Sequence, residues 1–152
     1  GIRVHNTGIP YNDPSGERLR AWMGVDRETF YDESRVAIVP MGFCFPGYDA
    51  HGGDLPPRPE CAAHWHDRLF SAAPKFSLIL AIGKYAQRYH LGEGVKSNVT
   101  QTVRSWREYG TGMVPLPHPS WRNNGWLKKN PWFEKELLPV LRARVRRALN
   151  AR

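Results

Sequence analysis

The sequence predicts an α/β fold in which the strands of one sheet run parallel. Three apolar runs have the length of strands, and they cover residues 35–41, 78–83 and 113–116. The first two lack a polar alternation, as is typical of strands that are buried on both faces of a sheet. Helical patterns lie between the runs at 60–70, 85–89 and 98–109, and a longer one follows at 132–149. Strands that alternate with helices indicate a parallel sheet.

The N-terminal region predicts a loop and then a helix. Residues 1–11 contain two glycines and a proline and show no periodic apolar face, so we expect a loop there. Asp13 and the three residues after it form a helix-start signal, Leu19 and Trp22 supply an apolar face, and Gly24 ends the helix. Asp13 has two interpretations, as the cap of this helix or as a functional acid.

A long stretch without periodicity separates the first two apolar runs. It begins at Gly42 and contains a glycine-rich and proline-rich segment at 52–59, and a loop of this length is usually functional or disordered. Cys44 and Cys61 lie on either side of it, and they are the chain's two cysteines. They are either buried thiols or part of a metal site. His64 and His66 lie near Cys61, but on a helix these three side chains do not share one face.

The third apolar run leads into the loop that we expect to carry the chemistry. In open parallel sheets, ligands bind beyond the carboxyl ends of the strands. His118 follows the run and is held between Pro117 and Pro119, which restrict the backbone on both sides of it. The alternative is a plain proline-rich turn. The loop continues with side chains that suit contacts with a nucleic acid, namely Ser120, Trp121, Arg122 and Asn123.

Charge and composition indicate a single basic domain over residues 1–152. The formal net charge is +8, and residues 122–152 hold nine basic and two acidic side chains, or +7 of that total. A polyanion is the expected partner, and a solvated basic helix is the competing interpretation. No apolar run reaches the length of a membrane span and no signal peptide is visible. We therefore expect a soluble, cytoplasmic monomer that does not bind membranes.

Several short motifs occur together in a set order. The sequence resembles the uracil-DNA glycosylase superfamily, in the branch related to the iron-sulfur enzymes, from residue 1 to about residue 146. The matching pieces are Thr7-Gly8-Ile9-Pro10-Tyr11, Ser15-Gly16-Glu17-Arg18-Leu19, Pro40-Met41-Gly42-Phe43-Cys44, Arg58-Pro59-Glu60-Cys61, Ile82-Gly83, His118-Pro119-Ser120-x-Arg122-Asn123 and Asn130-Pro131-Trp132-Phe133-Glu134.

The resemblance implies a fold and an activity. The fold is a three-layer α/β/α sandwich around a central parallel sheet of four strands in the order 2-1-3-4. The first of these strands would precede Gly1, so we expect the sequence to be N-terminally truncated and this fragment to be deficient in catalysis. The implied activity is hydrolysis of the bond between uracil and deoxyribose in DNA. Single-stranded or mismatched DNA should be preferred, because base extrusion costs least there. A DNA-binding module with the same fold and no catalysis is the alternative.

The resemblance also assigns roles to individual residues. His118 matches the histidine that donates to uracil O2, and Tyr11 matches the aromatic ring that stacks on the flipped base. Gly42 would line the base pocket together with Ser120. Apart from the resemblance, Asp13 is the sequence's own candidate for the acid that activates water, should the chain prove active as it stands. The expected DNA-contacting residues are Trp121, Arg122, Asn123, Lys128 and Lys129.

The resemblance further implies a cofactor and shows two departures from the family pattern. Cys44 and Cys61 match two of the four ligands of an iron-sulfur cluster, which we expect in the full-length protein as a four-iron four-sulfur cluster and not in this fragment. Pro40 falls on or near the position of the asparagine that reads the uracil edge in iron-sulfur relatives. Trp121 stands where a proline is usual.

Overall fold

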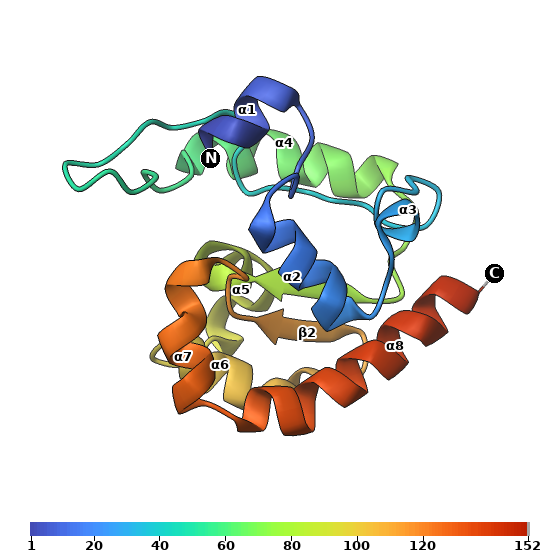
Figure 1. Cartoon of the computed structure of the whole chain (residues 1–152). Coiled ribbons are helices and arrows are strands. Elements are labelled where there is room, and N and C mark those ends of the chain that lie inside the picture. Colours follow the sequence, from blue (N-terminus) through green and yellow to red (C-terminus); the bar gives the residue numbers. More distant parts are fainter. Residues whose placement is uncertain (152) are drawn as a thin grey trace.

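The computed structural model describes residues 1–151 and shows a mixed α/β architecture (Figure 1). The helices are α1 (Ile2–Thr7), α2 (Pro14–Met23), α3 (Arg27–Phe30), α4 (Pro59–Ala72), α5 (Gly83–Leu91), α6 (Val99–Arg104), α7 (Asn124–Lys129) and α8 (Leu138–Asn150). The strands are β1 (Ile79–Ile82) and β2 (Met113–Leu116). Shorter turns of helix are η1 (Gly92–Gly94), η2 (Trp106–Tyr109), η3 (Trp121–Asn123) and η4 (Phe133–Leu137).

The two strands form a small parallel sheet. Ile79 pairs with Met113 at one end and Ile82 pairs with Leu116 at the other, and both arrows in Figure 1 point the same way. Two of the three predicted strands are therefore confirmed. Pro115 has no N–H to donate, and a proline inside a strand is found on edge strands. This residue marks β2 as the edge of the sheet, while within residues 1–151 β1 pairs with no strand other than β2.

The predicted strand at 35–41 is wrong. The segment is extended but belongs to no strand, and Ala37 and Pro40 are exposed. A strand is defined by its hydrogen-bonded partner, and no other segment of the described chain pairs with this one. The apolar run predicted a strand that is buried on both faces of a sheet. Such a strand needs neighbouring strands to pair with, and the run itself does not indicate whether they are present.

The helices also differ in part from the prediction. Residues 2–7, predicted as a loop, form α1, which ends at Gly8 in a left-handed conformation with φ 68°. The long helix predicted at 132–149 is confirmed, and it contains the π-helical turn η4 immediately before α8, in which Pro139 is the second residue. Proline lacks the N–H for the helical ladder and clashes with the carbonyl four residues earlier. The helix predicted at 98–109 is split into α6 and η2, with Ser105 between them.

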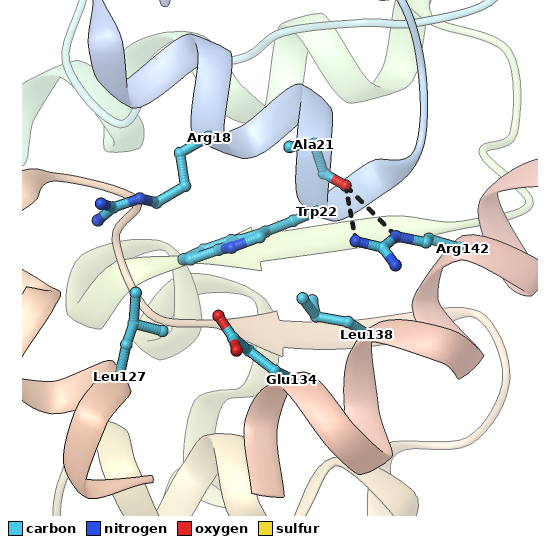
Figure 2. A pocket seen from close by; sticks show the side chains of 7 residues that line it. All are labelled: Arg18, Ala21, Trp22, Leu127, Glu134, Leu138 and Arg142. Atoms are coloured by element: carbon cyan, nitrogen blue, oxygen red, sulfur yellow. Dashed lines mark hydrogen bonds between the residues drawn. The ribbon is translucent and has the colours of Figure 1, made fainter. Parts of the chain in front are cut away.

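The core lies between the sheet and the helices α2 and α8. Trp22 of α2 packs edge-on against Phe133, with ring centroids 4.9 Å apart. Figure 2 shows the Trp22 ring lining a surface pocket of about 600 Å³, into which Glu134 points from below. The buried apolar side chains of this core include Leu19, Met23, Phe30, Val103, Trp106, Val114, Leu116, Leu137, Leu138, Leu141 and Val145.

A buried glutamine ties the two strands together at their carboxyl ends. Gln87 of α5 is 2% exposed. Its Nε2 donates to the carbonyl oxygen of Leu116 at 2.8 Å and to that of Ala81 at 3.4 Å. The two hydrogens of the Gln87 side-chain amide are therefore both donated, one to a carbonyl oxygen of β1 and one to a carbonyl oxygen of β2.

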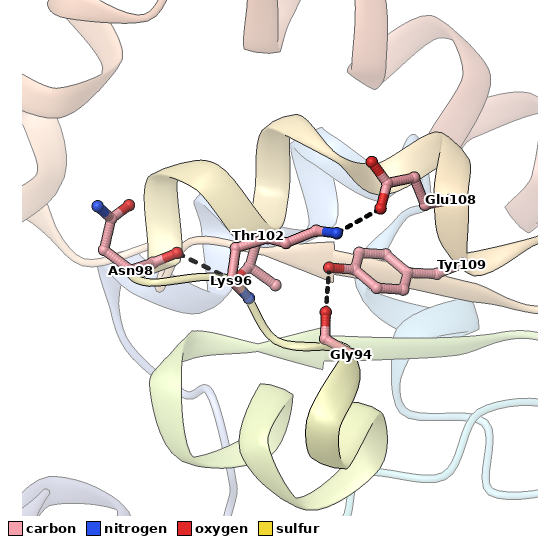
Figure 3. Close-up of polar contacts among 6 residues, drawn as sticks. All are labelled: Gly94, Lys96, Asn98, Thr102, Glu108 and Tyr109. Atoms are coloured by element: carbon pink, nitrogen blue, oxygen red, sulfur yellow. Dashed lines mark hydrogen bonds and ion pairs between the residues drawn. The ribbon is translucent and has the colours of Figure 1, made fainter.

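The connection from α5 to α6 is held by polar contacts (Figure 3). The hydroxyl of Tyr109 donates to the carbonyl oxygen of Gly94 at 2.8 Å, and the ammonium of Lys96 pairs with Glu108. Asn98 caps α6 by accepting the backbone N–H of Gln101. These contacts fix the turn that leads back towards β2.

Candidate functional site

The carboxyl ends of both strands meet beneath His118. Pro117 and Pro119 are buried, while His118 between them is exposed. Gly83 follows β1 with φ 81°, and a Cβ at this position would lie 3.9 Å from the Cβ of His118. The residues that follow the second and third apolar runs therefore come together, as predicted from the parallel arrangement.

Hydrogen bonding fixes the tautomer of His118. Its Nδ1 accepts the backbone N–H of Ser120 at 3.2 Å. Desolvation lowers the pKa of His118 below its ordinary value, although the carboxylate of Asp13 opposes the shift. The imidazole is therefore neutral at pH 7. A neutral ring carries one proton, and because Nδ1 is the acceptor, that proton lies on Nε2. Nε2–H is thus a hydrogen-bond donor.

The loop after His118 is braced from two directions. Asn123 donates from Nδ2 to the carbonyl oxygen of His118 at 2.7 Å. Arg18 of α2 donates from Nη1 to the carbonyl oxygen of Ser120 at 3.0 Å and from Nη2 to Oδ1 of Asn124 at 2.6 Å. Arg18 was not predicted as a site residue. It belongs to one of the matching motifs, but no local pattern indicates a partner 102 residues later.

Tyr11 lies beside the imidazole in an unusual backbone conformation. It is the non-glycine residue of the described chain with a positive φ, at 57°. Its ring stacks on that of His118 with centroids 6.4 Å apart and packs edge-on against Phe30 at 6.2 Å. Burial raises the pKa of Tyr11 to about 12, and Asp13 adds to the shift. The phenol is therefore neutral over the working range of pH.

Gly16 makes room for the Tyr11 turn. A Cβ at Gly16 would lie 1.8 Å from the carbonyl oxygen of Tyr11, so no other residue fits without movement of the backbone. Asp13 caps α2, because its Oδ1 accepts the backbone N–H of Gly16 at 3.0 Å. The capping interpretation of Asp13 is therefore confirmed. Its charge acts to raise the pKa of both Tyr11 and His118.

The expected DNA-contacting side chains lie on the loop and on α7. Trp121 is 71% exposed, and the guanidinium of Arg122 lies 5.9 Å from the centre of its ring. Lys128 and Lys129 are exposed in the last turn of α7. Arg122 also adjoins the loop at 49–53, because a Cβ at Gly53 would lie 3.3 Å from its Nη1. No sequence pattern indicated that loop as a neighbour of the site.

Gly42 and the cysteines lie on the α4 side of the molecule. A Cβ at Gly42 would be 3.2 Å from Cβ of Pro57, and no strand ends at this glycine. Cys44 is exposed, while Cys61 in the first turn of α4 is partly buried, and both are free thiols. Phe43 packs against His66 of α4 with ring centroids 5.7 Å apart. His66 is fully buried among aromatic rings rather than offered as a ligand.

The donor set falls short of what a cluster needs. A four-iron four-sulfur cluster takes four thiolate ligands, and the sequence contains two cysteines. Among residues 1–151 no three histidine, cysteine or acidic side chains gather as metal ligands. Cys44 and Cys61 are therefore the two thiolates that this sequence could offer to a cluster.

The chain matches a known protein family over most of its length. The family model of the uracil DNA glycosylase superfamily matches residues 1–142. The chain belongs to this superfamily. Its members act on DNA as glycosylases, a class of hydrolases, and the match covers Tyr11, Gly16 and the whole His118 loop. None of the described helices is both long and apolar enough to cross a lipid bilayer.

Proposed function

We propose that this uracil-DNA glycosylase superfamily member hydrolyses the N-glycosidic bond between uracil and deoxyribose in DNA. The observation that carries the proposal is the state of His118, which is a neutral Nε2–H donor on a braced loop above the carboxyl ends of the strands. The aromatic wall of Tyr11 stands beside it. A flipped base stacked on Tyr11 would present a carbonyl oxygen to Nε2, and stacking on a splayed base contributes ~1 to 3 kcal/mol.

The proposed chemistry uses His118 as a donor to developing charge. As the bond from N1 of uracil to C1′ of the sugar breaks, the bonding electrons leave with the base and negative charge spreads to O2. A fixed Nε2–H hydrogen bond to O2 is then stronger in the transition state than in the ground state, and such a donor contributes ~3 kcal/mol. Because the imidazole is neutral, it gives a hydrogen bond without having to lose a proton.

We propose Asp13 as the group that accepts the proton of the attacking water. One carboxylate oxygen holds the N–H of Gly16, which leaves the other for water. Water adds its oxygen to C1′ and yields its proton to Asp13, while the departing uracil anion takes a proton from solvent. Asp13→Asn preserves a good helix cap but removes the base. The variant should lose base release without losing thermal stability.

The exposed loop and α7 form the proposed DNA-contacting surface. It consists of Trp121, Arg122, Asn123, Lys128 and Lys129. Charged side chains hold the phosphates, and an exposed aromatic ring suits insertion beside the vacated base. Single-stranded or mismatched DNA is the proposed preferred substrate, since unstacking costs least there.

We also propose membership of the branch related to the iron-sulfur enzymes and a sheet of four strands. The edge of β1 turned away from β2 is compatible with a further strand. Support for a cluster is limited to Cys44 and Cys61, which lie on a segment and a helix that pack together through Phe43 and His66. Iron and sulfide analysis of anaerobically purified protein, with visible absorbance, tests for the cluster.

The test of the activity is an oligonucleotide assay. The full-length protein is incubated with single-stranded, mismatched and paired DNA that carries uracil at one position, and abasic sites are then cleaved with alkali. Strand scission above a control without enzyme is the expected result. Oligonucleotides with hypoxanthine or thymine at the same position test base selectivity, because Pro40 lacks a side-chain donor. Salt-dependent binding without base release from any of these substrates would favour the non-catalytic DNA-binding module.

A further inference from the structure

Arg18 joins α2 to the loop that carries His118. Its two terminal nitrogens donate to the carbonyl oxygen of Ser120 and to Oδ1 of Asn124. Figure 2 shows the side chain leaving α2 and extending beyond the Trp22 ring towards the chain that follows β2. The planar guanidinium is therefore fixed at both terminal nitrogens by acceptors of the loop, in a geometry that an ammonium group does not reproduce.

The same end of α2 also fixes Tyr11. Gly16 accommodates the carbonyl oxygen of Tyr11, and Arg18 lies two residues further along the helix. The first turns of α2 therefore contact both halves of the site, the aromatic ring through Gly16 and the imidazole loop through Arg18. The relative position of Tyr11 and His118 depends on this one helix.

We propose that Arg18 is a positioning residue that holds the His118 loop at the separation from Tyr11 that base release requires. The effect on rate rests on the proposed glycosylase function, whereas the effect on loop order does not. Arg18 is argued to act through Ser120 and Asn124, because these are the two groups to which its terminal nitrogens donate. A displacement of about 1 Å in a catalytic group can cost about 100-fold in rate.

The experiment compares variants in single-turnover base release and in DNA binding. Arg18→Met keeps the apolar stem and removes the guanidinium, and it should lower the rate constant about 10-fold or more with a change in Kd of less than about 3-fold. Arg18→Lys keeps the charge without the planar fork and should remain close to Arg18→Met. Asn124→Leu should lower the rate by a smaller factor, and adding it to Arg18→Met should cause no further loss.

The matched control is an exposed arginine away from the site. Arg107 lies in η2, ahead of the amino end of β2, and pairs with Glu136 at 3.3 Å. Arg107→Met removes the same group, one ion pair and a cation–π contact with Trp106 at 4.3 Å, and it should leave the rate unchanged. The proposal would be overturned if Arg18→Lys had the rate of the parent or if Arg18→Met left the rate unchanged. Either result would mean that the planar guanidinium of Arg18 does not position the loop.

Hydrogen exchange of the backbone amides at 118–124 gives the second readout. Arg18→Met should raise exchange in this loop and leave the amides of β1 and β2 protected. If the parent protein releases no base, the proposed function fails but the exchange comparison still decides whether Arg18 orders the loop. Equal exchange in parent and variant would overturn the positioning role in either case.

Discussion

Gly16→Ala should damage both the fold and the site, because the new methyl group would meet the Tyr11 turn. The Cβ would lie 1.8 Å from the carbonyl oxygen of Tyr11, whereas real Cβ contacts essentially never fall below 3.0 Å. One of the two backbone segments must therefore move by at least 1.2 Å, the difference between these distances. Gly16 also donates its N–H to Asp13, so the movement disturbs the cap of α2 as well.

The expected loss of stability combines two contributions. Overpacking costs about 1 to 3 kcal/mol, and a disturbed cap costs about 1 kcal/mol more. A total of about 2 to 4 kcal/mol corresponds to a fall in Tm of roughly 5 to 15 °C for a chain of this size. Base release per folded molecule should fall too, since Tyr11 is displaced relative to His118.

Gly125→Ala is the matched control for this prediction. Gly125 lies inside α7, and no atom outside its own helix approaches within 4 Å of its Cβ position. Removing a helical glycine should raise stability by up to about 1 kcal/mol. Chemical and thermal denaturation of both variants provides the measurement. If Gly16→Ala melts at the temperature of the parent and keeps its activity, the argument that Gly16 holds the Tyr11 turn is refuted.

Three further predictions concern the chemistry, the DNA surface and pH. His118→Ala should lower base release by ~100-fold or more with nearly unchanged DNA affinity, because the donor acts on transition-state charge. A variant that loses stability but keeps full activity per folded molecule would instead show that His118 is only a turn residue. Two variants test the DNA surface, Arg122→Ala and the double variant Lys128→Ala with Lys129→Ala. Each should weaken DNA binding and reduce the slope of log K against log salt by about 1 for each phosphate that the variant no longer neutralises. Slopes equal to that of the parent would rule out this surface. Desolvation lowers the pKa of His118 and of His90 below 6.5. The unfolded chain therefore binds more protons than the folded chain as pH falls through 6.5, and the free energy of unfolding should decrease in urea titrations taken from pH 7 to pH 5.

Local signals in the sequence predicted those parts of the fold whose causes are local. The residues predicted for the last strand, 113–116, are the residues of β2, and α2 begins and ends at the predicted cap and glycine. The segment at 35–41 failed because its apolar run says nothing about whether a partner strand lies beside it. The helix predicted at 132–149 is continuous as expected, and the π-helical turn that precedes Pro139 reflects the local effect of this proline on the helical ladder.

One part of the site could be predicted from the sequence, because it depends only on the parallel direction of the two strands. Because parallel strands end at the same edge, Gly83 and His118 were expected to meet, and they do. The contact of Arg18 with Ser120 joins residues 102 positions apart and leaves no periodic or compositional trace. The left-handed turn at Tyr11 is equally hidden, since its cause is the absence of a side chain at Gly16 rather than a property of Tyr11 itself.

The two ends of the small sheet are held by different hydrogen bonds, because Gln87 contacts both strands near their carboxyl ends. At the amino end the backbone N–H of Ile79 bonds to the carbonyl oxygen of Gly112 at 2.8 Å, beside exposed chain. At the carboxyl end the buried amide of Gln87 must also release both strands before they can separate. Fraying of the ladder should therefore begin at the amino end and reach Leu116 last. The end of the sheet that carries the imidazole should therefore be the last to open.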